Sequence, residues 1–218
     1  MKQLHVNNLL STLAVVLAVA GCATDTPTAV NAQADAAPKV DAIALMKATF
    51  KDKGQALASR IDQDELQRTC SEYAAKQLDL PKDVRERLEA SEKKLIKAPS
   101  DGKYLGDWKR GEATAQNGRG FQWTDDPKAP TGANCYACHQ LSKAELSYGN
   151  IGPSLLNYGK VRGQGKEMLE YTWGKIFNSH AYNACSVMPR YGTRNLITEQ
   201  QVKDVMALLF DPNSPVNQ

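Results

Sequence analysis

Apolar residues recur at helical spacing along several stretches of the chain, and no stretch alternates apolar and polar residues over the length of a strand. The spacing predicts a helix within 40–50, a second from about Asp62 to Leu78, and a third that starts at Pro81, where proline favours helix initiation. Two more helices are predicted over 107–117 and 198–210. The pattern therefore predicts an all-α fold.

The predicted helix over 198–210 carries the clearest end signals. Thr198 and Gln201 have the spacing of a capping box, and the Asp211-Pro212 pair stops the helix. Its apolar positions indicate a helix that packs into the core; they are Val202, Val205, Met206, Leu208, Leu209 and Phe210.

The composition changes near residue 100. Residues 98–102 (APSDG) interrupt the helical pattern, and loops rich in glycine, asparagine and aromatic residues follow. Gly111 lies within the predicted 107–117 helix, where glycine costs stability relative to alanine but permits close helix approach. We therefore expect a helical extension over 40–100 and a main domain over 101–218.

The N-terminus has the features of an export signal. The apolar run at 9–20 (LLSTLAVVLAVA) follows Lys2, is too short to span a bilayer comfortably and ends in small residues. The Val-Ala-Gly that precedes Cys22 resembles a bacterial lipobox, whose cysteine is lipidated. This predicts a signal peptide over 1–21, a lipid-anchored tether over 22–39 and a periplasmic, membrane-anchored lipoprotein. The alternative is an ordinary signal peptide with Cys22 incidental.

Composition and charge narrow the class of protein. Hydrophobic residues make up 42% and charged residues 23% of the chain, as in soluble globular proteins. The net charge is +3 and no long basic block occurs, so nothing indicates nucleic-acid binding. Export places the cysteines in an oxidising compartment. Cys70 and Cys185 lie outside the motifs, which suggests a disulfide between them; the alternative is two separate thiols.

Residues 134–139 (NCYACH) contain C-x-x-C-H, the signature of covalent haem attachment. In such sites the two thiols, here Cys135 and Cys138, add to the haem vinyl groups, and the histidine, here His139, becomes the proximal iron ligand. A thioredoxin-like redox pair would need a βαβ context. A zinc site would need further cysteine or histidine pairs, and the chain has only three histidines. The motif therefore predicts one haem c.

The second axial ligand must come from another segment. A methionine raises the haem potential and suits electron transfer. Met188 is the favoured candidate, because it lies in an irregular loop before the last helix and Pro189 stiffens that loop. His180 is the rival, in a bis-histidine site. Met168 is a weaker candidate, and Met206 is assigned to the core.

The order of three motifs resembles class I cytochromes c: C-x-x-C-H, then G-P-x-L at 152–155, then M-P at 188–189 before a terminal helix. The resemblance implies that the Pro153 carbonyl accepts the Nδ1 proton of His139, which fixes the imidazole. Three further residues are placed near the haem: Tyr171 and Trp173 in the pocket wall, and Arg190 beside a propionate or else in solvent.

Five segments of the main domain resemble the SoxX family, the monohaem subunits of the SoxAX cytochromes of sulfur-oxidising bacteria. The resemblance implies covalent haem on Cys135 and Cys138, with His139 as proximal and Met188 as distal ligand. The segments are GDWKRGEATAQNGRGFQW (106–123), GANCYACHQL (132–141), SYGNIGPSLLNYGKVRG (147–163), YTWGKIFNSHAYNACSVMPRYG (171–192) and LITEQQVKDVMALL (196–209).

The family's function follows as an expectation from this resemblance. SoxAX joins thiosulfate to a cysteine of the carrier SoxYZ, an oxidative S–S conjugation (L-cysteine S-thiosulfotransferase activity) with the catalytic haem on SoxA. The resemblance implies an electron-transfer subunit without catalytic residues, paired with SoxA and passing electrons to a small soluble cytochrome c. The alternatives are a free-standing lipid-tethered shuttle and a haem enzyme or ligand sensor, which would need an open sixth iron position.

Overall fold

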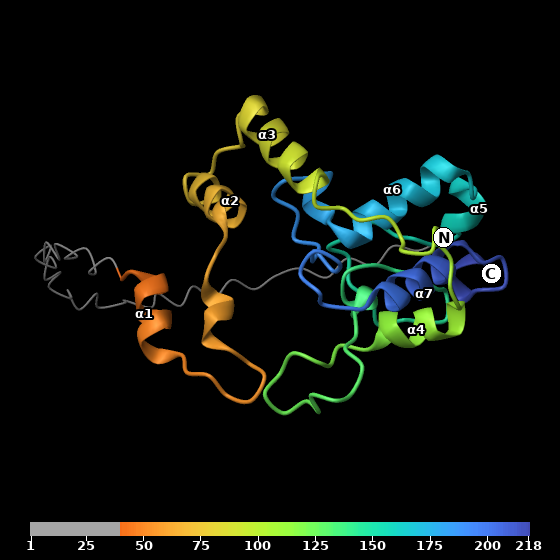
Figure 1. Cartoon of the computed structure of the whole chain (residues 1–218), viewed down its shortest axis with the longest axis horizontal. Coiled ribbons are helices and arrows are strands. Elements are labelled where there is room, and N and C mark those ends of the chain that lie inside the picture. Colours follow the sequence, from red (N-terminus) through yellow and green to blue (C-terminus); the bar gives the residue numbers. More distant parts are fainter. Residues whose placement is uncertain (1–39) are drawn as a thin grey trace, which may run out of the picture. The chain divides into compact units, whose positions relative to one another are not determined.

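Helices carry the fold of residues 40–218, the part of the chain that this computed structural model describes (Figure 1). These residues contain no β-strand, so the all-α prediction is confirmed for them. The predicted signal peptide, Cys22 and the tether lie outside the described residues. The α-helices are α1 (Ala42–Thr49), α2 (Glu65–Ala75), α3 (Lys82–Lys93), α4 (Trp108–Gln116), α5 (Tyr158–Arg162), α6 (Lys166–Phe177) and α7 (Glu199–Phe210). Short 3-10 helices are η1 (Ala58–Ile61), η2 (Cys135–Ala137), η3 (Ser179–Ala181) and η4 (Pro215–Asn217).

The core of the main domain is built on α7. Thr198 caps its N-terminus and forms the predicted capping box with Gln201. From Val202 to Phe210 every residue of this helix is buried, which exceeds the one apolar side that the sequence predicted. The helix is covered on several sides, by α4, α5, α6 and η4. Met206 has no exposed surface, as its assignment to the core requires.

Helix α4 lies beside α7, and the contact between them is very close (Figure 1). A Cβ atom built at Gly111 would stand 2.0 Å from the carbonyl oxygen of Asp204 on α7. The carboxylate of Asp204 in turn accepts hydrogen bonds from the guanidinium of Arg110, at 2.9 Å from Nε and from Nη2. Gly111 thus permits the helix approach that its mid-helix position predicted.

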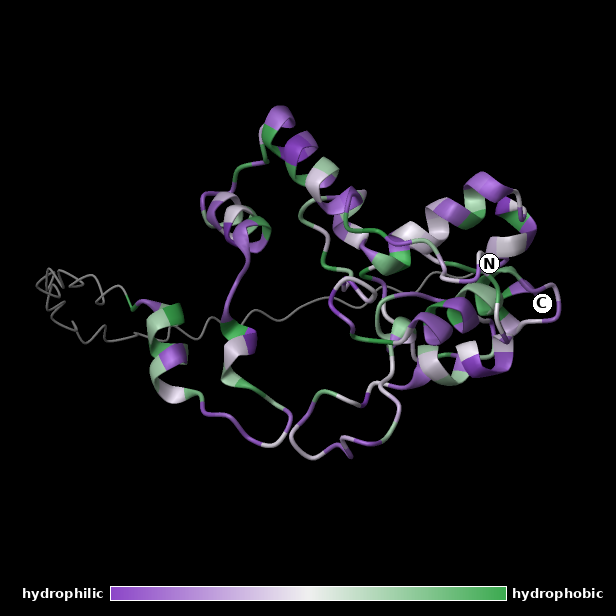
Figure 2. Cartoon of the chain, in the orientation of Figure 1, coloured by the Kyte–Doolittle hydropathy of each residue, from purple (hydrophilic) through white to green (hydrophobic). Residues whose placement is uncertain are grey.

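The extension before residue 100 contributes α1, α2 and α3, and α3 is mostly hydrophilic (Figure 2). Asp64 caps α2 in a capping box with Gln67. A disulfide joins Cys70 of α2 to Cys185 in the main domain, with an S–S distance of 2.01 Å. Residues 41–218 form one unit by their contacts. Among the described residues, no helix combines the length and the apolar character that crossing a bilayer requires.

Candidate haem-binding site

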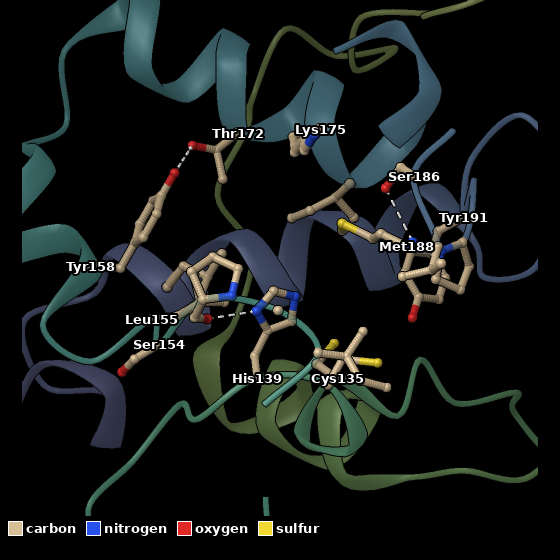
Figure 3. Close-up of a pocket in the computed structure, with 18 of the residues that line it drawn as sticks. Cys135, His139, Ser154, Leu155, Tyr158, Thr172, Lys175, Ser186, Met188 and Tyr191 are labelled. Carbon is tan, nitrogen blue, oxygen red and sulfur yellow. Dashed lines mark hydrogen bonds between the residues drawn. The ribbon is translucent and has the colours of Figure 1, made fainter. Parts of the chain in front are cut away.

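A cavity of about 590 Å³ opens between the C-x-x-C-H motif and the loop that carries Met188 (Figure 3). Cofactor sites typically measure roughly 300–1,000 Å³ and are lined mainly by apolar side chains. Helix α6 and the segment 151–156 supply further walls. The cavity thus brings together motifs that the sequence places far apart.

The C-x-x-C-H motif forms a tight turn on one wall of the cavity. Asn134 takes a left-handed conformation, φ +49°, which asparagine tolerates better than most residues. The His139 amide then donates to the Cys135 carbonyl at 2.9 Å. Cys135, Cys138 and His139 all line the cavity, and both cysteines carry free thiols. Burial raises the pKa of the Cys135 thiol to about 12, and the neighbouring Cys138 adds to the effect.

Backbone hydrogen bonds hold the segment 149–155 against the C-x-x-C-H motif. The Gly149 amide donates to the Tyr136 carbonyl at 2.8 Å, and the Gly152 amide donates to the Cys138 carbonyl at 2.8 Å. Gly152 has no room for a side chain, because a Cβ there would stand 2.1 Å from the ring of His139. The segment therefore fixes the position of Pro153 relative to His139.

The hydrogen bond between His139 and Pro153, which the resemblance implied, is present. His139 Nδ1 lies 2.8 Å from the Pro153 carbonyl oxygen (Figure 3). A carbonyl oxygen only accepts hydrogen bonds, so Nδ1 carries the proton in this contact. Nε2 is then the unprotonated nitrogen, which can bind a metal ion, and the ring orientation is fixed by the bond at Nδ1.

Met188 lines the cavity from the loop before α7, and its sulfur points into the cavity in Figure 3. Two local hydrogen bonds hold its backbone. The Met188 amide donates to Ser186 Oγ at 3.1 Å, and the Ser179 hydroxyl donates to the Met188 carbonyl at 2.5 Å. A thioether thus faces a cavity that also holds an imidazole and two thiols, which is the donor set of a His/Met c-type haem.

The rival ligands lie elsewhere in the structure. His180 is buried on η3 outside the cavity wall, and its Nε2 lies 2.9 Å from the Ser186 carbonyl. Burial, together with the positive charge of Arg190, lowers the pKa of His180. The sulfur of Met168 lies 3.9 Å from the Tyr158 hydroxyl, and Met168 does not line the cavity. Neither residue is placed to compete with Met188.

Two residues expected near the haem face other parts of the protein. Arg190 is buried, with 6% of its surface exposed, and it pairs with carboxylates of the extension rather than meeting the cavity or solvent. A buried guanidinium requires such partners. Trp173 packs in the core, and its indole Nε1 donates to the Lys97 carbonyl at 2.8 Å. Tyr171 does line the cavity, as expected.

Of the cavity wall formed by helix α6 and the residues before it, the sequence identified only Tyr171. The hydroxyl groups of Tyr158 and Thr172 lie 2.9 Å apart, and both residues line the cavity (Figure 3). Lys175 also lines it, and burial lowers the pKa of its ammonium group. The signal for this wall is the helical spacing of Thr172, Lys175 and Ile176, which places these three residues on one face of α6.

The chain is 35% identical over 159 residues to an "Uncharacterized lipoprotein" of Aquifex aeolicus (strain VF5), an alignment that covers 71% of this chain and 73% of that protein. No protein-family model matches the chain. The similarity is extensive enough to indicate a shared fold and shared ancestry.

Proposed function

The chain belongs to the family of the Aquifex aeolicus lipoprotein, and we propose that it is an exported, lipid-anchored c-type cytochrome with one haem. The observation that carries this proposal is the composition of the cavity. Cys135, Cys138 and His139 line one wall, and Met188 lines the wall of the loop before α7. The lipobox-like Val-Ala-Gly-Cys22 and the lipoprotein description of the relative support the anchor.

Each of these residues has a distinct task in this proposal. Cys135 and Cys138 would hold the haem covalently, and His139 and Met188 would be its axial ligands. The haem iron, once bound, takes up and releases one electron. The Pro153 carbonyl keeps the imidazole proton on Nδ1 and so leaves Nε2 for the metal.

The cavity wall favours electron transfer over chemistry at the metal. With Met188 as its sixth ligand, the haem iron would have no free position for an exogenous substrate. Leu155, Ile176 and Leu209 line the cavity and reduce the access of water. A mainly apolar surrounding limits reorganisation when the charge of the site changes, because few polar groups must reorient.

We further propose that the electrons come from a SoxA-type partner during thiosulfate conjugation to SoxYZ, and that a small soluble cytochrome c receives them. Support for this finer assignment is the resemblance of five segments between 106 and 209 to the SoxX family. The free-standing, lipid-tethered shuttle is the alternative, and it uses the same haem site.

Covalent haem is tested by producing the full chain in a bacterial host with a c-type cytochrome maturation system. We expect one haem per chain, visible by peroxidase staining of a denaturing gel and by the alkaline pyridine spectrum. The matched control is Cys135→Ser/Cys138→Ser, which must lose the stain, whereas Cys70→Ser/Cys185→Ser must keep it. A wild-type chain that matures without covalent haem would refute the cytochrome assignment.

The partner assignment is tested separately, by gentle purification from the native host grown on thiosulfate. A second, larger haem-bearing polypeptide in constant proportion supports the SoxAX assignment and places catalysis on that partner. Recovery of a lone monohaem protein contradicts it and leaves the tethered shuttle.

A further inference from the structure

The extension has a structural relationship with the loop that carries Met188, here called the distal loop (residues 183–191). The buried residues of α2 and α3 are Leu66, Leu88 and Glu92. Leu66 and Leu88 form a small cluster with Ala184 of the distal loop. Glu92 contacts Arg190 within this loop and Asn178 before it. The buried surface of α2 and α3 is thus directed at one short segment of the main domain.

A covalent bond fixes the start of the distal loop. Cys185 lines the cavity and is separated from Met188 only by Ser186 and Val187. Its disulfide partner is Cys70 of α2. Next to it, the Ala184 amide donates to Glu89 Oε1 of α3 at 3.1 Å. The loop therefore cannot move away from α2 and α3 at this point while the disulfide is intact.

Buried ion pairs fix the other end of the loop. Arg190 follows Met188 and Pro189, and its Nη2 lies 2.6 Å from Asp64 Oδ2 at the N-cap of α2. Its Nη1 lies 3.4 Å from Glu92 Oε2 of α3. The same Glu92 carboxylate accepts a hydrogen bond from Asn178 Nδ2 at 2.8 Å, at the end of α6.

The distal loop has little internal structure of its own. It contains turns and bends but no regular helix, and the Met188 backbone has only the local bonds from Ser186 and Ser179. Segments of this kind open locally at a lower free-energy cost than core helices do. Restraints at both ends raise that cost, because they reduce the conformations that the opened loop can reach.

We infer that α2 and α3 are a positioning element for the axial ligand, which keeps Met188 in the cavity by tying both ends of the distal loop to the extension. This inference rests on the proposed role of Met188 as the distal ligand. It assigns a task to the extension, which the haem motifs alone do not explain. The positioning residues in this arrangement are Cys70, Cys185, Glu89 and Arg190. None of these four would touch the iron, which Met188 would bind.

The test is imidazole binding to the oxidised, haem-loaded protein, because imidazole reaches the iron only when Met188 leaves it. We expect Cys70→Ser/Cys185→Ser to bind imidazole at least about tenfold more tightly than wild type and to bind it faster. Glu89→Ala, a milder change at the same loop, should give a smaller increase in the same direction. If the double variant fails to fold, Glu89→Ala alone decides the outcome.

A matched control separates positioning from general destabilisation. Arg110→Gln weakens the contact between α4 and α7, away from the distal loop, and should leave imidazole affinity unchanged. The inference is overturned if this variant raises the affinity as much as the disulfide variant, or if neither the disulfide variant nor Glu89→Ala changes it. Met188→Ala is measured in parallel. If it binds imidazole with wild-type affinity, the ligand assignment itself fails; if it binds more tightly while the extension variants do not, only the positioning role fails.

Discussion

Gly152 lies against the imidazole of His139 so closely that a Cβ atom at Gly152 would stand 2.1 Å from the ring Cε1 and 2.4 Å from Nδ1. The contact is with the side chain that the proposed haem needs as its proximal ligand. Only the absence of a side chain at residue 152 allows the imidazole to keep its hydrogen bond to the Pro153 carbonyl.

Gly152→Ala should therefore displace the His139 ring and break its bond to Pro153. We expect a severalfold lower yield of haem-loaded protein and a visible spectrum that indicates altered axial ligation. The control is Gly165→Ala at the N-cap of α6, where a Cβ atom would meet nothing within 4 Å. Equal yields and identical spectra for the two variants would contradict this account of Gly152.

Met188→Ala should remove the thioether from the cavity. Methionine ligation raises the potential of a haem, so the variant should have a lower midpoint potential than wild type. Its oxidised form should also bind exogenous imidazole at least about tenfold more tightly, equivalent to about 1.4 kcal/mol. Redox titration and spectroscopic binding check these outcomes. Met46→Ala in α1 is the control and should change neither quantity.

Gly111→Ala should disturb the contact between α4 and α7. The new methyl group would meet the Asp204 carbonyl at 2.0 Å, and this backbone atom can move only if a buried helix moves with it. We expect a loss of about 1–3 kcal/mol in the free energy of unfolding, measured by chemical denaturation. The exposed Lys109→Ala in the same helix should stay within about 0.5 kcal/mol of wild type. If Gly111→Ala had the same free energy of unfolding as wild type, α4 and α7 would have to separate easily.

Asp204 should make the protein sensitive to acid. Burial alone would raise the pKa of this carboxyl, but hydrogen bonds from Arg110, from the Asp107 amide and from Gln200 hold it below its ordinary value. The unfolded chain has the higher pKa, about 3.9. The ionised group therefore contributes its full stabilisation above that value and loses it as the pH falls through the lower, folded-state pKa.

Asp204→Asn tests this relationship. It should lower the free energy of unfolding by about 1–3 kcal/mol at pH 7, and the stability of the variant should depend less on pH below about 4 than that of wild type. Denaturation curves between pH 3 and 7 measure both effects. Asp79→Asn, at an exposed position, serves as the control. If the free energy of unfolding fell in parallel with pH for Asp204→Asn and wild type, the acid sensitivity would come from other carboxylates.

Local signals were sufficient to predict part of this structure. The capping box of Thr198 and Gln201 identified the start of α7, and the C-x-x-C-H spacing identified the wall of the cavity, because both depend on residues close in sequence. Helix α6 was not predicted. Its apolar residues have helical spacing, but Tyr171, Thr172 and Gly174 are poor helix formers, so propensity and pattern disagree there.

The environment of Arg190 could not be predicted from local sequence. Its partners Asp64 and Glu92 lie in the extension, and only the folded chain brings them to the distal loop. When these partners are unknown, an arginine two residues after a proposed haem ligand is assigned to a haem propionate. Helices α2 and α3 look hydrophilic in the sequence, and their few buried residues are too widely spaced to indicate what they contact.

The distribution of cysteines has a consequence for how the protein matures. The four cysteines in residues 40–218 could be joined into two disulfides in three ways, and the folded chain contains the Cys70–Cys185 bond and two free thiols. That bond closes a long loop, and Cys135 and Cys138 lie inside it. If these neighbours oxidised each other first during export, no thiol would remain for a thioether. If the proposed function holds, the order of thiol oxidation and haem attachment after export would decide how much of the newly made chain becomes a cytochrome.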